Sequence, residues 1–197
     1  MLSVREPILK PVAIADLRPT QMTVGIREVK EKRKRWHDES KKKGDEFLGK
    51  HMIPVVLGPE DRHYVIDHHH LARALHDEGV KNVMVTVVKN LRTLEPDSFW
   101  FVLDNHSWMH AYDDVGRLHP YKDLPMTVAA LTDDPFRSLA GELRRAGGFA
   151  KELLRRNGQH YRPPRWCVVA GRGLYWHYDR DPAYQAAVAA AASQFAR

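Results

Sequence analysis

Short apolar runs bounded by turn residues fill the first 90 residues of the chain. They predict a short strand and turn over residues 8–17 and further strands at 53–57, 63–66 and 83–89. Helical spacing between them predicts one helix from Gly25 to a break at 41–44, and a second helix over 69–78 that is closed by Gly79. The order strand, helix, strand hairpin, helix, strand predicts a compact α+β core.

The second half of the chain is dominated by helical patterns. Residues 95–110 predict a helix rich in aromatic side chains. The sequence Asp133-Asp134-Pro135 predicts the start of a helix that runs to Arg145, because Asp is a good cap and Pro suits the first helical position. Further helices are expected over 149–156 and 182–196.

Composition favours a folded protein of the cytoplasm. The chain has 197 residues and 43% hydrophobic content, enough to bury a core, and we expect a core domain over 1–92 with a helical extension over 93–197 packed on it. The single cysteine, Cys167, allows no internal disulfide. Neither a secretory signal nor a membrane-spanning run is found in the sequence, so we expect a cytoplasmic location and no membrane partner.

The basic residues gather in one stretch of a chain whose formal net charge is +6. Residues 27–50 hold ten Lys or Arg and six Asp or Glu. One interpretation is a face that follows the phosphates of nucleic acid. The other is a solvated helix surface laced with ion pairs, which is favoured because aromatic rings for base stacking are scarce there apart from Trp36.

Four polar residues, Asp67-His68-His69-His70, join an apolar run to the helical pattern that starts at Leu71. The first amides of a helix are unpaired and the helix dipole is positive there, so a strand that runs into a helix makes an anion-binding corner. We therefore predict the functional site at residues 67–70.

A metal ion is a second possibility at this corner, with Asp67 and His69 as candidate ligands. Three successive histidines cannot all face one ligand, and their spacing is not that of a metal motif. Mg²⁺ that bridges a bound phosphate is favoured over direct ligation by the histidines. In the alternative without a ligand, one histidine caps the helix and the others are core or surface residues.

The residues 53–56 and 65–75 resemble the strand, polar corner and helix of the ParB/sulfiredoxin superfamily, in its ParB-like nuclease branch. The resemblance extends over about residues 8–151 and includes the segments 21–29, 121–125, 133–141 and 147–151. It implies a ParB/sulfiredoxin-like core, which is a small mixed sheet with helices, followed by a mainly helical C-terminal extension.

In this superfamily the corner contacts phosphate. Partition proteins carry Gly-Glu-Arg-Arg there and bind nucleotide with it, and a related free serine kinase carries Asp-Gly-His-His-Arg. Asp67, His69 and His70 match the kinase motif, whereas His68 stands in place of its glycine and Leu71 in place of its arginine. That glycine lets the backbone approach phosphate closely and that arginine grips it. The cysteine that sulfiredoxin carries at this corner is absent, which excludes peroxiredoxin repair.

The resemblance also implies residue roles. Glu28 matches the glutamate that acts as the base, and with it Asp67, His69 and His70 form the expected catalytic set. The expected phosphate- or nucleotide-binding set is Thr23, Arg27, Lys32, His68, His69 and His70. The alternative for Glu28 is an exposed helix residue paired with Lys32.

We therefore expect an enzyme that binds a nucleotide or phosphodiester and catalyses phosphoryl transfer or hydrolysis, as a phosphotransferase, an ATPase or a nuclease. ATP or another nucleotide and Mg²⁺ are the candidate cofactors. The alternative is a DNA-associated, nucleotide-switched protein related to chromosome or plasmid partition proteins. Those proteins carry a helix-turn-helix after the core, and residues 95–151 show no basic recognition helix, which favours the enzyme.

Overall fold

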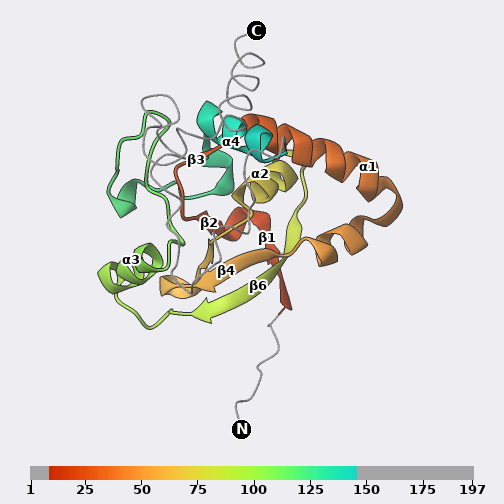
Figure 1. Cartoon of the computed structure of the whole chain (residues 1–197). Coiled ribbons are helices and arrows are strands. Elements are labelled where there is room, and N and C mark those ends of the chain that lie inside the picture. Colours follow the sequence, from red (N-terminus) through yellow and green to blue (C-terminus); the bar gives the residue numbers. More distant parts are fainter. Residues whose placement is uncertain (1–8, 146–197) are drawn as a thin grey trace.

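A five-stranded mixed sheet forms the centre of the molecule (Figure 1). The computed structural model of the chain describes residues 9–145, so the helices expected over 149–156 and 182–196 lie outside the described residues. The strand order is β1-β6-β4-β5-β2. These strands are β1 (Leu9–Ala13), β2 (Leu17–Pro19), β4 (Ile53–Leu57), β5 (His63–Val65) and β6 (Asn82–Asn90).

Both strand directions occur in this sheet. The pairs β1–β6 and β4–β5 are antiparallel, whereas β4–β6 and β2–β5 are parallel. A separate two-stranded parallel sheet joins β3 (Thr23–Val24) to β7 (Thr132–Asp133). The α+β class with a small mixed sheet is confirmed.

Alternation along the strands gives the sheet two apolar faces. On one face, Val55, Val65 and Val85 are fully buried in the main core, which α1 (Ile26–Lys50) and α2 (His69–Asp77) complete. On the other face, Val56 packs with Phe99 and Leu103 of α3 (Pro96–Asn105). Figure 1 shows α1 and α2 above the sheet and α3 at its lower left.

The predicted break in the first helix is wrong, because α1 continues through Gly44 to Lys50. A glycine inside a helix costs about 1 kcal/mol relative to alanine. Beyond it, Phe47 is buried and its ring packs edge-on against Trp36 at 5.2 Å. Burial of an aromatic side chain stabilises by roughly 2–3 kcal/mol, which outweighs the glycine.

The helix expected over 95–110 ends early, at Asn105. Ser107 takes a φ of 55°, which breaks the helical path. The chain that follows pairs with the loop before β3, where His110 donates its amide to the Thr20 carbonyl at 2.7 Å and accepts the Met22 amide at 3.2 Å. These tertiary hydrogen bonds outweigh the local helical pattern.

The described part of the expected extension lies against the core domain. β7 pairs with β3, and α4 (Pro135–Arg145) packs on α1. The predicted capping at Asp134 is confirmed, because its Oδ1 accepts the amide of Phe136 at 2.9 Å. Within residues 9–145, no helix is long and apolar enough to cross a lipid bilayer.

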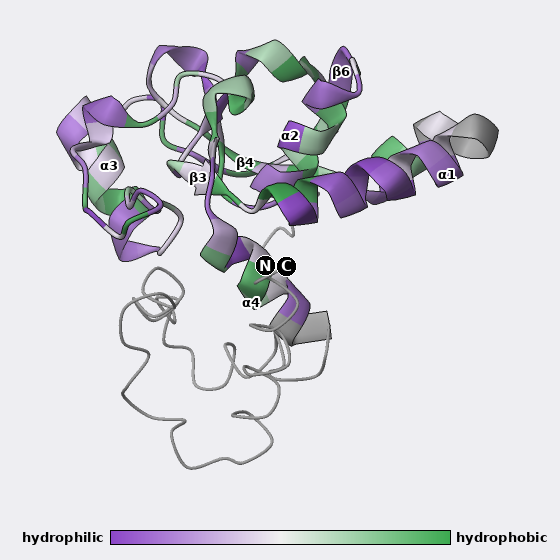
Figure 2. Cartoon of the chain, turned by 90° about the horizontal axis from the view of Figure 1, so that it is seen from above, coloured by the Kyte–Doolittle hydropathy of each residue, from purple (hydrophilic) through white to green (hydrophobic). Residues whose placement is uncertain are grey.

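The long helix α1 consists of hydrophilic residues along much of its length (Figure 2). Several of its cations are paired with acids: Arg35 with Glu39 at 2.7 Å, Lys50 with Glu46 at 2.5 Å, and Arg33 with Glu78 of the α2 C-cap at 2.5 Å. This pattern is typical of the solvated, ion-paired surface that the sequence favoured.

Candidate functional site

The corner between β5 and α2 turns through a left-handed residue. His68 is the N-cap of α2 and has φ 64° and ψ 25°, a region that favours glycine. Its amide donates to Oδ1 of Asp67 at 2.7 Å, and its Nδ1 lies 3.1 Å from the Met52 carbonyl. The turn at position 68 therefore has the backbone conformation that a glycine adopts easily, although the residue is histidine.

The first backbone amides of α2 make no hydrogen bond within the helix. The first helical hydrogen bond runs from the Ala72 amide to the His68 carbonyl at 2.9 Å. The amides of residues 69–71 precede Ala72 and lie at the positive end of the helix dipole. Asp67, directly before this end, is exposed.

His69 is buried and held as a neutral imidazole. Its side chain is 5% exposed, and its Nε2 accepts the Thr20 amide at 3.2 Å. It also hydrogen-bonds the backbone of Val65. Burial, and then the positive charge of Arg137, hold the pKa of His69 well below its usual range. An unprotonated acceptor fits the Thr20 amide.

His70 fastens the start of α2 to the start of α1. Its Nε2 accepts the Gly25 amide at 3.0 Å. The next two amides along α1 are bonded as well, Ile26 to Asp133 Oδ1 at 2.8 Å and Arg27 to Ser138 Oγ at 3.2 Å. Three elements thus cap the positive end of α1.

Glu28 lies in the contact between α1 and α4. It is 6% exposed, so the alternative of an exposed helix residue is wrong. A Cβ at Gly141 would lie within 2.9 Å of three atoms of the Glu28 side chain. The Glu28 carboxylate therefore occupies space that exists because residue 141 is glycine.

The other members of the predicted phosphate-binding set lie in different surroundings. Arg27 is exposed and Lys32 is half-buried on the first turns of α1. Thr23 is fully buried, and its hydroxyl accepts a hydrogen bond from Nε of Arg137 at 3.0 Å. The same hydroxyl lies 3.5 Å from Oδ2 of Asp134. The structure therefore brings Thr23 together with Arg137 and Asp134 of α4 and its cap.

Arg137 is a further member of this site, outside the predicted catalytic and phosphate-binding sets. Its side chain is 17% exposed, its Nη1 donates to Oε1 of Gln21 at 3.3 Å, and its Nε lies 3.6 Å from Asp134 Oδ2. Burial raises the pKa of Asp134 despite the amides and the Arg137 charge that favour its ionised form. The i,i+3 spacing of Asp134 and Arg137 at a helix start was the available sequence signal.

His110 lies near Arg137, in the segment after α3 that pairs with the loop before β3. Burial, and then the Arg137 charge, lower the pKa of His110 to about 3. The Nδ1 of His110 is buried and has no hydrogen-bond partner within the described residues. His110 also lines a cavity of about 610 Å³.

The buried polar side chains of the described residues gather in one region. They come from the loop around β3, the first turns of α1 and α2, and the start of α4, and we call them the buried polar cluster: Thr20, Gln21, Thr23, Glu28, His69, Asp134 and Ser138. Buried polar groups are costly unless they are hydrogen-bonded, so their concentration marks a candidate functional site.

A metal ion has limited support from these side chains. Within residues 9–145, no three His, Cys, Asp or Glu side chains form a group that could hold a metal. The Nε2 of His69 is directed at Thr20, whereas Asp67 is exposed and keeps a carboxylate oxygen available. Asp67 therefore fits a Mg²⁺ ion that is bound mainly by ligand phosphates, and His69 does not fit as a direct ligand in this arrangement.

Comparison with known proteins places these observations in a family. A family model described as "Putative ParB-like nuclease" matches residues 10–162. A crystal structure of protein Atu1540 from Agrobacterium tumefaciens is similar at 46% identity and a TM-score of 0.66, over 74% of this chain and 72% of that one. Among curated proteins, none matches the sequence. The family match covers well over half of the chain, and the chain therefore belongs to the ParB-like nuclease family.

Proposed function

We propose that the protein binds the phosphate of a nucleotide or phosphodiester at residues 67–70 and catalyses phosphoryl transfer or hydrolysis. The observation that supports this proposal is the buried polar cluster, which adjoins the α2 N-terminus and contains Glu28. Membership of the ParB-like nuclease family agrees with a phosphate-bearing ligand.

The α2 corner supplies the charge for binding. Amides at a helix N-terminus and nearby cations stabilise phosphoryl oxygens, and Arg27 and Lys32 are the cations on the adjoining turns of α1. Asp67 offers an oxygen to Mg²⁺ on the ligand. A bound Mg²⁺ would neutralise charge on the phosphate.

Glu28 is the proposed general base, which takes a proton from the attacking water or hydroxyl. His69 and His70 act on this carboxylate indirectly, because their Nε2 atoms hold the amides of Thr20 and Gly25. These two bonds fix the segment that carries Thr23 and leads into Glu28. In this proposal both histidines are positioning residues in their neutral forms.

The first test separates binding from turnover. Thermal unfolding is measured with ATP, ADP, CTP and a twelve-nucleotide single strand, each with Mg²⁺. A ligand at about a hundred times its Kd stabilises by about 2.7 kcal/mol, a shift of a few degrees for a chain of this size. Release of phosphate or of shorter oligonucleotides is then measured with any ligand that shifts the midpoint.

The matched variants are Glu28→Gln and Glu39→Gln, both on α1. Glu28→Gln should keep the ligand-induced shift and lower turnover by about 10²-fold or more. Glu39 is paired with Arg35 on the exposed surface, and Glu39→Gln should change neither quantity. The double variant Arg27→Gln/Lys32→Gln should weaken binding. Full turnover by Glu28→Gln, or no shift with any of the four ligands, would refute the proposal.

A further inference from the structure

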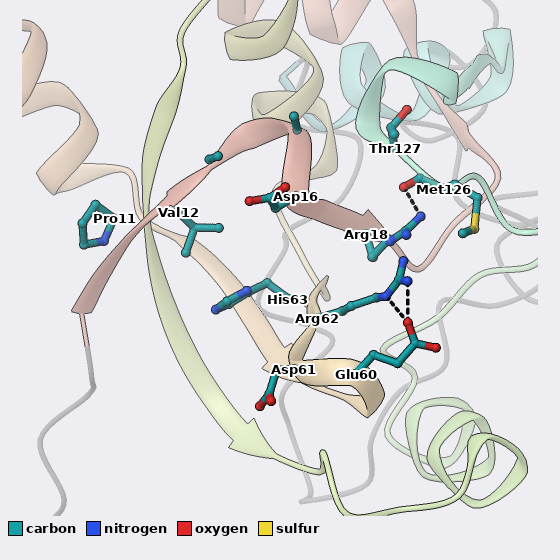
Figure 3. Close-up of a pocket in the computed structure, with 12 residues that line it drawn as sticks. Pro11, Val12, Asp16, Arg18, Glu60, Asp61, Arg62, His63, Met126 and Thr127 are labelled. Atoms are coloured by element: carbon teal, nitrogen blue, oxygen red, sulfur yellow. Dashed lines mark hydrogen bonds and ion pairs between the residues drawn. The ribbon is translucent and has the colours of Figure 1, made fainter.

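Three cavities adjoin one another in succession through shared lining residues. The first, of about 520 Å³, lies between β1, β2 and the turn before β5 (Figure 3). A second cavity, of about 190 Å³, shares Arg18, Glu60, Arg62 and Met126 with it. Tyr121 lines both this second cavity and the cavity of about 610 Å³ that contains His110. We call the whole the Tyr121 groove.

The second cavity carries positive charge in excess, with Arg18, Arg62 and Lys122 in its lining against Glu60. The first cavity is also lined by Asp16 and Asp61, and the third by Asp104. Figure 3 shows the guanidinium groups of Arg18 and Arg62 at the same end of the first cavity. Glu60 pairs with Arg62, whereas the Arg18 Nη1 donates only to the Met126 carbonyl, at 2.6 Å. Lys122 lines the second cavity, and within residues 9–145 no carboxylate pairs with Arg18 or Lys122. The second cavity therefore holds two cations that no acid balances.

Aromatic rings stand beside these cations. Tyr121 is 37% exposed and lies on Trp100, with ring centroids 5.6 Å apart and planes at 22°. Trp100 is fixed in turn by Tyr64, whose ring meets it edge-on at 5.5 Å. Tyr64, Trp100 and Tyr121 all line the second cavity. The ring of Tyr121 is thus held in place by Trp100, is partly exposed, and lies beside Arg18 and Lys122 in the lining of the second cavity.

Alternating cations and aromatic rings are the features that bind single-stranded nucleic acid, in which the bases are free to stack and the phosphates face the cations. The basic stretch of α1 lacks this combination, since its Trp36 packs against Phe47 and three of its cations, Arg33, Arg35 and Lys50, are paired with acids. The third cavity adjoins the buried polar cluster, because His110 in its lining donates its backbone amide to the Thr20 carbonyl at 2.7 Å.

We propose that the Tyr121 groove binds a single-stranded nucleic acid, with a base stacked on Tyr121 and phosphates on Arg18 and Lys122. Single-stranded nucleic acid would then be the substrate class of the proposed activity, and this catalytic role rests on the proposed function. Binding itself is measurable without turnover.

The test is fluorescence anisotropy of labelled dT12 and rU12 at several salt concentrations, with the full chain. Tyr121→Ala should weaken binding by about ten-fold or more, and Tyr121→Phe should retain it, because stacking needs the ring alone. Lys122→Gln should lower the slope of log Kd against log salt by about 0.7, the value for one phosphate contact on a single strand. A blunt duplex of the same sequence should bind more weakly.

Phe101→Ala is the matched control. Phe101 is a 66% exposed aromatic residue on α3 that lines none of the three cavities, so its removal should leave binding unchanged. Lys122 is exposed, and Lys122→Gln keeps the test decisive if Tyr121→Ala does not fold.

Several outcomes would overturn the inference: no binding of dT12 or rU12, equal affinity of a folded Tyr121→Ala, an unchanged salt slope in Lys122→Gln, or displacement of dT12 by a glutamate peptide of equal charge. Binding of dT12 and turnover, both measured on the wild type, separate the two proposals. Tight dT12 binding without turnover in the wild type supports the groove and contradicts the phosphoryl-transfer activity, whereas turnover of a free nucleotide without dT12 binding does the reverse.

Discussion

The imidazole of His70 accepts the backbone amide of Gly25 across 45 residues of sequence, at an N···N distance of 3.0 Å. A nitrogen that accepts an amide hydrogen carries no proton, so this bond defines the tautomer of His70. On the other side of Gly25, a Cβ would lie 2.6 Å from the amide nitrogen and the hydroxyl of Ser138. The start of α1 is therefore packed between α2 and α4. The contact with α2 needs the imidazole of His70, and the contact with α4 needs a glycine at position 25.

His70→Ala should destabilise the fold by about 1–3 kcal/mol. It removes the acceptor of the Gly25 amide and leaves a partly buried donor unsatisfied, which costs about that much. Urea unfolding measures the stability, and hydrogen exchange of the Gly25 amide should become faster. Unchanged protection of this amide would contradict the structural role assigned to His70.

Gly141→Ala should destabilise the protein by about 1–3 kcal/mol, because the added methyl group overpacks the site of the Glu28 carboxylate. Helix propensity alone would give the opposite sign, with a gain of about 1 kcal/mol. Gly44→Ala supplies that control, since a Cβ there meets Trp36 and Ser40 at ordinary distances of 3.8 and 3.9 Å.

A double-mutant cycle locates the cause. If the clash is with Glu28, the cost of Gly141→Ala should shrink in a Glu28→Ala background, with a coupling of about 1 kcal/mol or more. Equal costs in the two backgrounds would show that the carboxylate does not occupy this space.

Local signals in the sequence were sufficient for much of the fold. The strand predicted at 53–57 is β4, and Gly79 has the left-handed φ of 73° expected of a residue that closes α2. The helix breaks were less predictable. Gly44 resembles a stop signal locally, and only the burial of Phe47 against Trp36 explains why α1 passes through it.

The candidate site also has one part that was predictable from local sequence and one part that was not. Residues 67–70 were identifiable because strand, polar corner and helix are contiguous in the sequence. The contacts of Arg137 with Thr23 and Gln21 span 114 and 116 residues, and no local pattern encodes them. The pairing of β3 with β7, which brings these residues together, is equally long-range.

Stability should fall as the pH decreases below about 6.5, because burial holds the pKa of His69 and His110 below the value of the unfolded chain. In that pH range the unfolded chain binds protons at these two histidines, whereas the folded state does not. For His110, whose folded pKa is about 3, the cost is up to about 1.4 kcal/mol per pH unit, or about 2 kcal/mol at pH 5, and His69 acts in the same direction. For His110 the loss continues until its folded pKa of about 3 is reached.

Urea unfolding at pH 7.5, 6 and 5 measures this loss, and His110→Asn should flatten the profile. Asp134 acts in the opposite sense, since burial raises its pKa and the fold favours its protonated form. NMR gives the direct readout, because the imidazole signals of His110 should keep their neutral positions at pH 5 and those of His69 should titrate below the usual range of histidine. Titration of either ring near pH 6.5 would contradict the burial argument.

The φ of 64° at His68 predicts an order of stability among substitutions at this position. Glycine adopts that conformation without strain, whereas other residues pay about 1–2 kcal/mol, and β-branched residues more. His68 offsets part of this cost through its contact with the Met52 carbonyl at 3.1 Å. We expect the free energy of unfolding to follow the order Gly, His, Ala, Val, with His68→Gly at or above the wild type.

The same series reports on phosphate binding. If the corner binds phosphate through the amides of residues 69–71, His68→Gly removes a side chain next to them and should strengthen nucleotide binding. His68→Ala removes the imidazole too, so it controls for the side chain and leaves the backbone strain. Tighter binding by both variants would show that the histidine obstructs the corner. Tighter binding by His68→Gly alone would assign the gain to the backbone conformation, and weaker binding by both would make the imidazole itself a ligand contact.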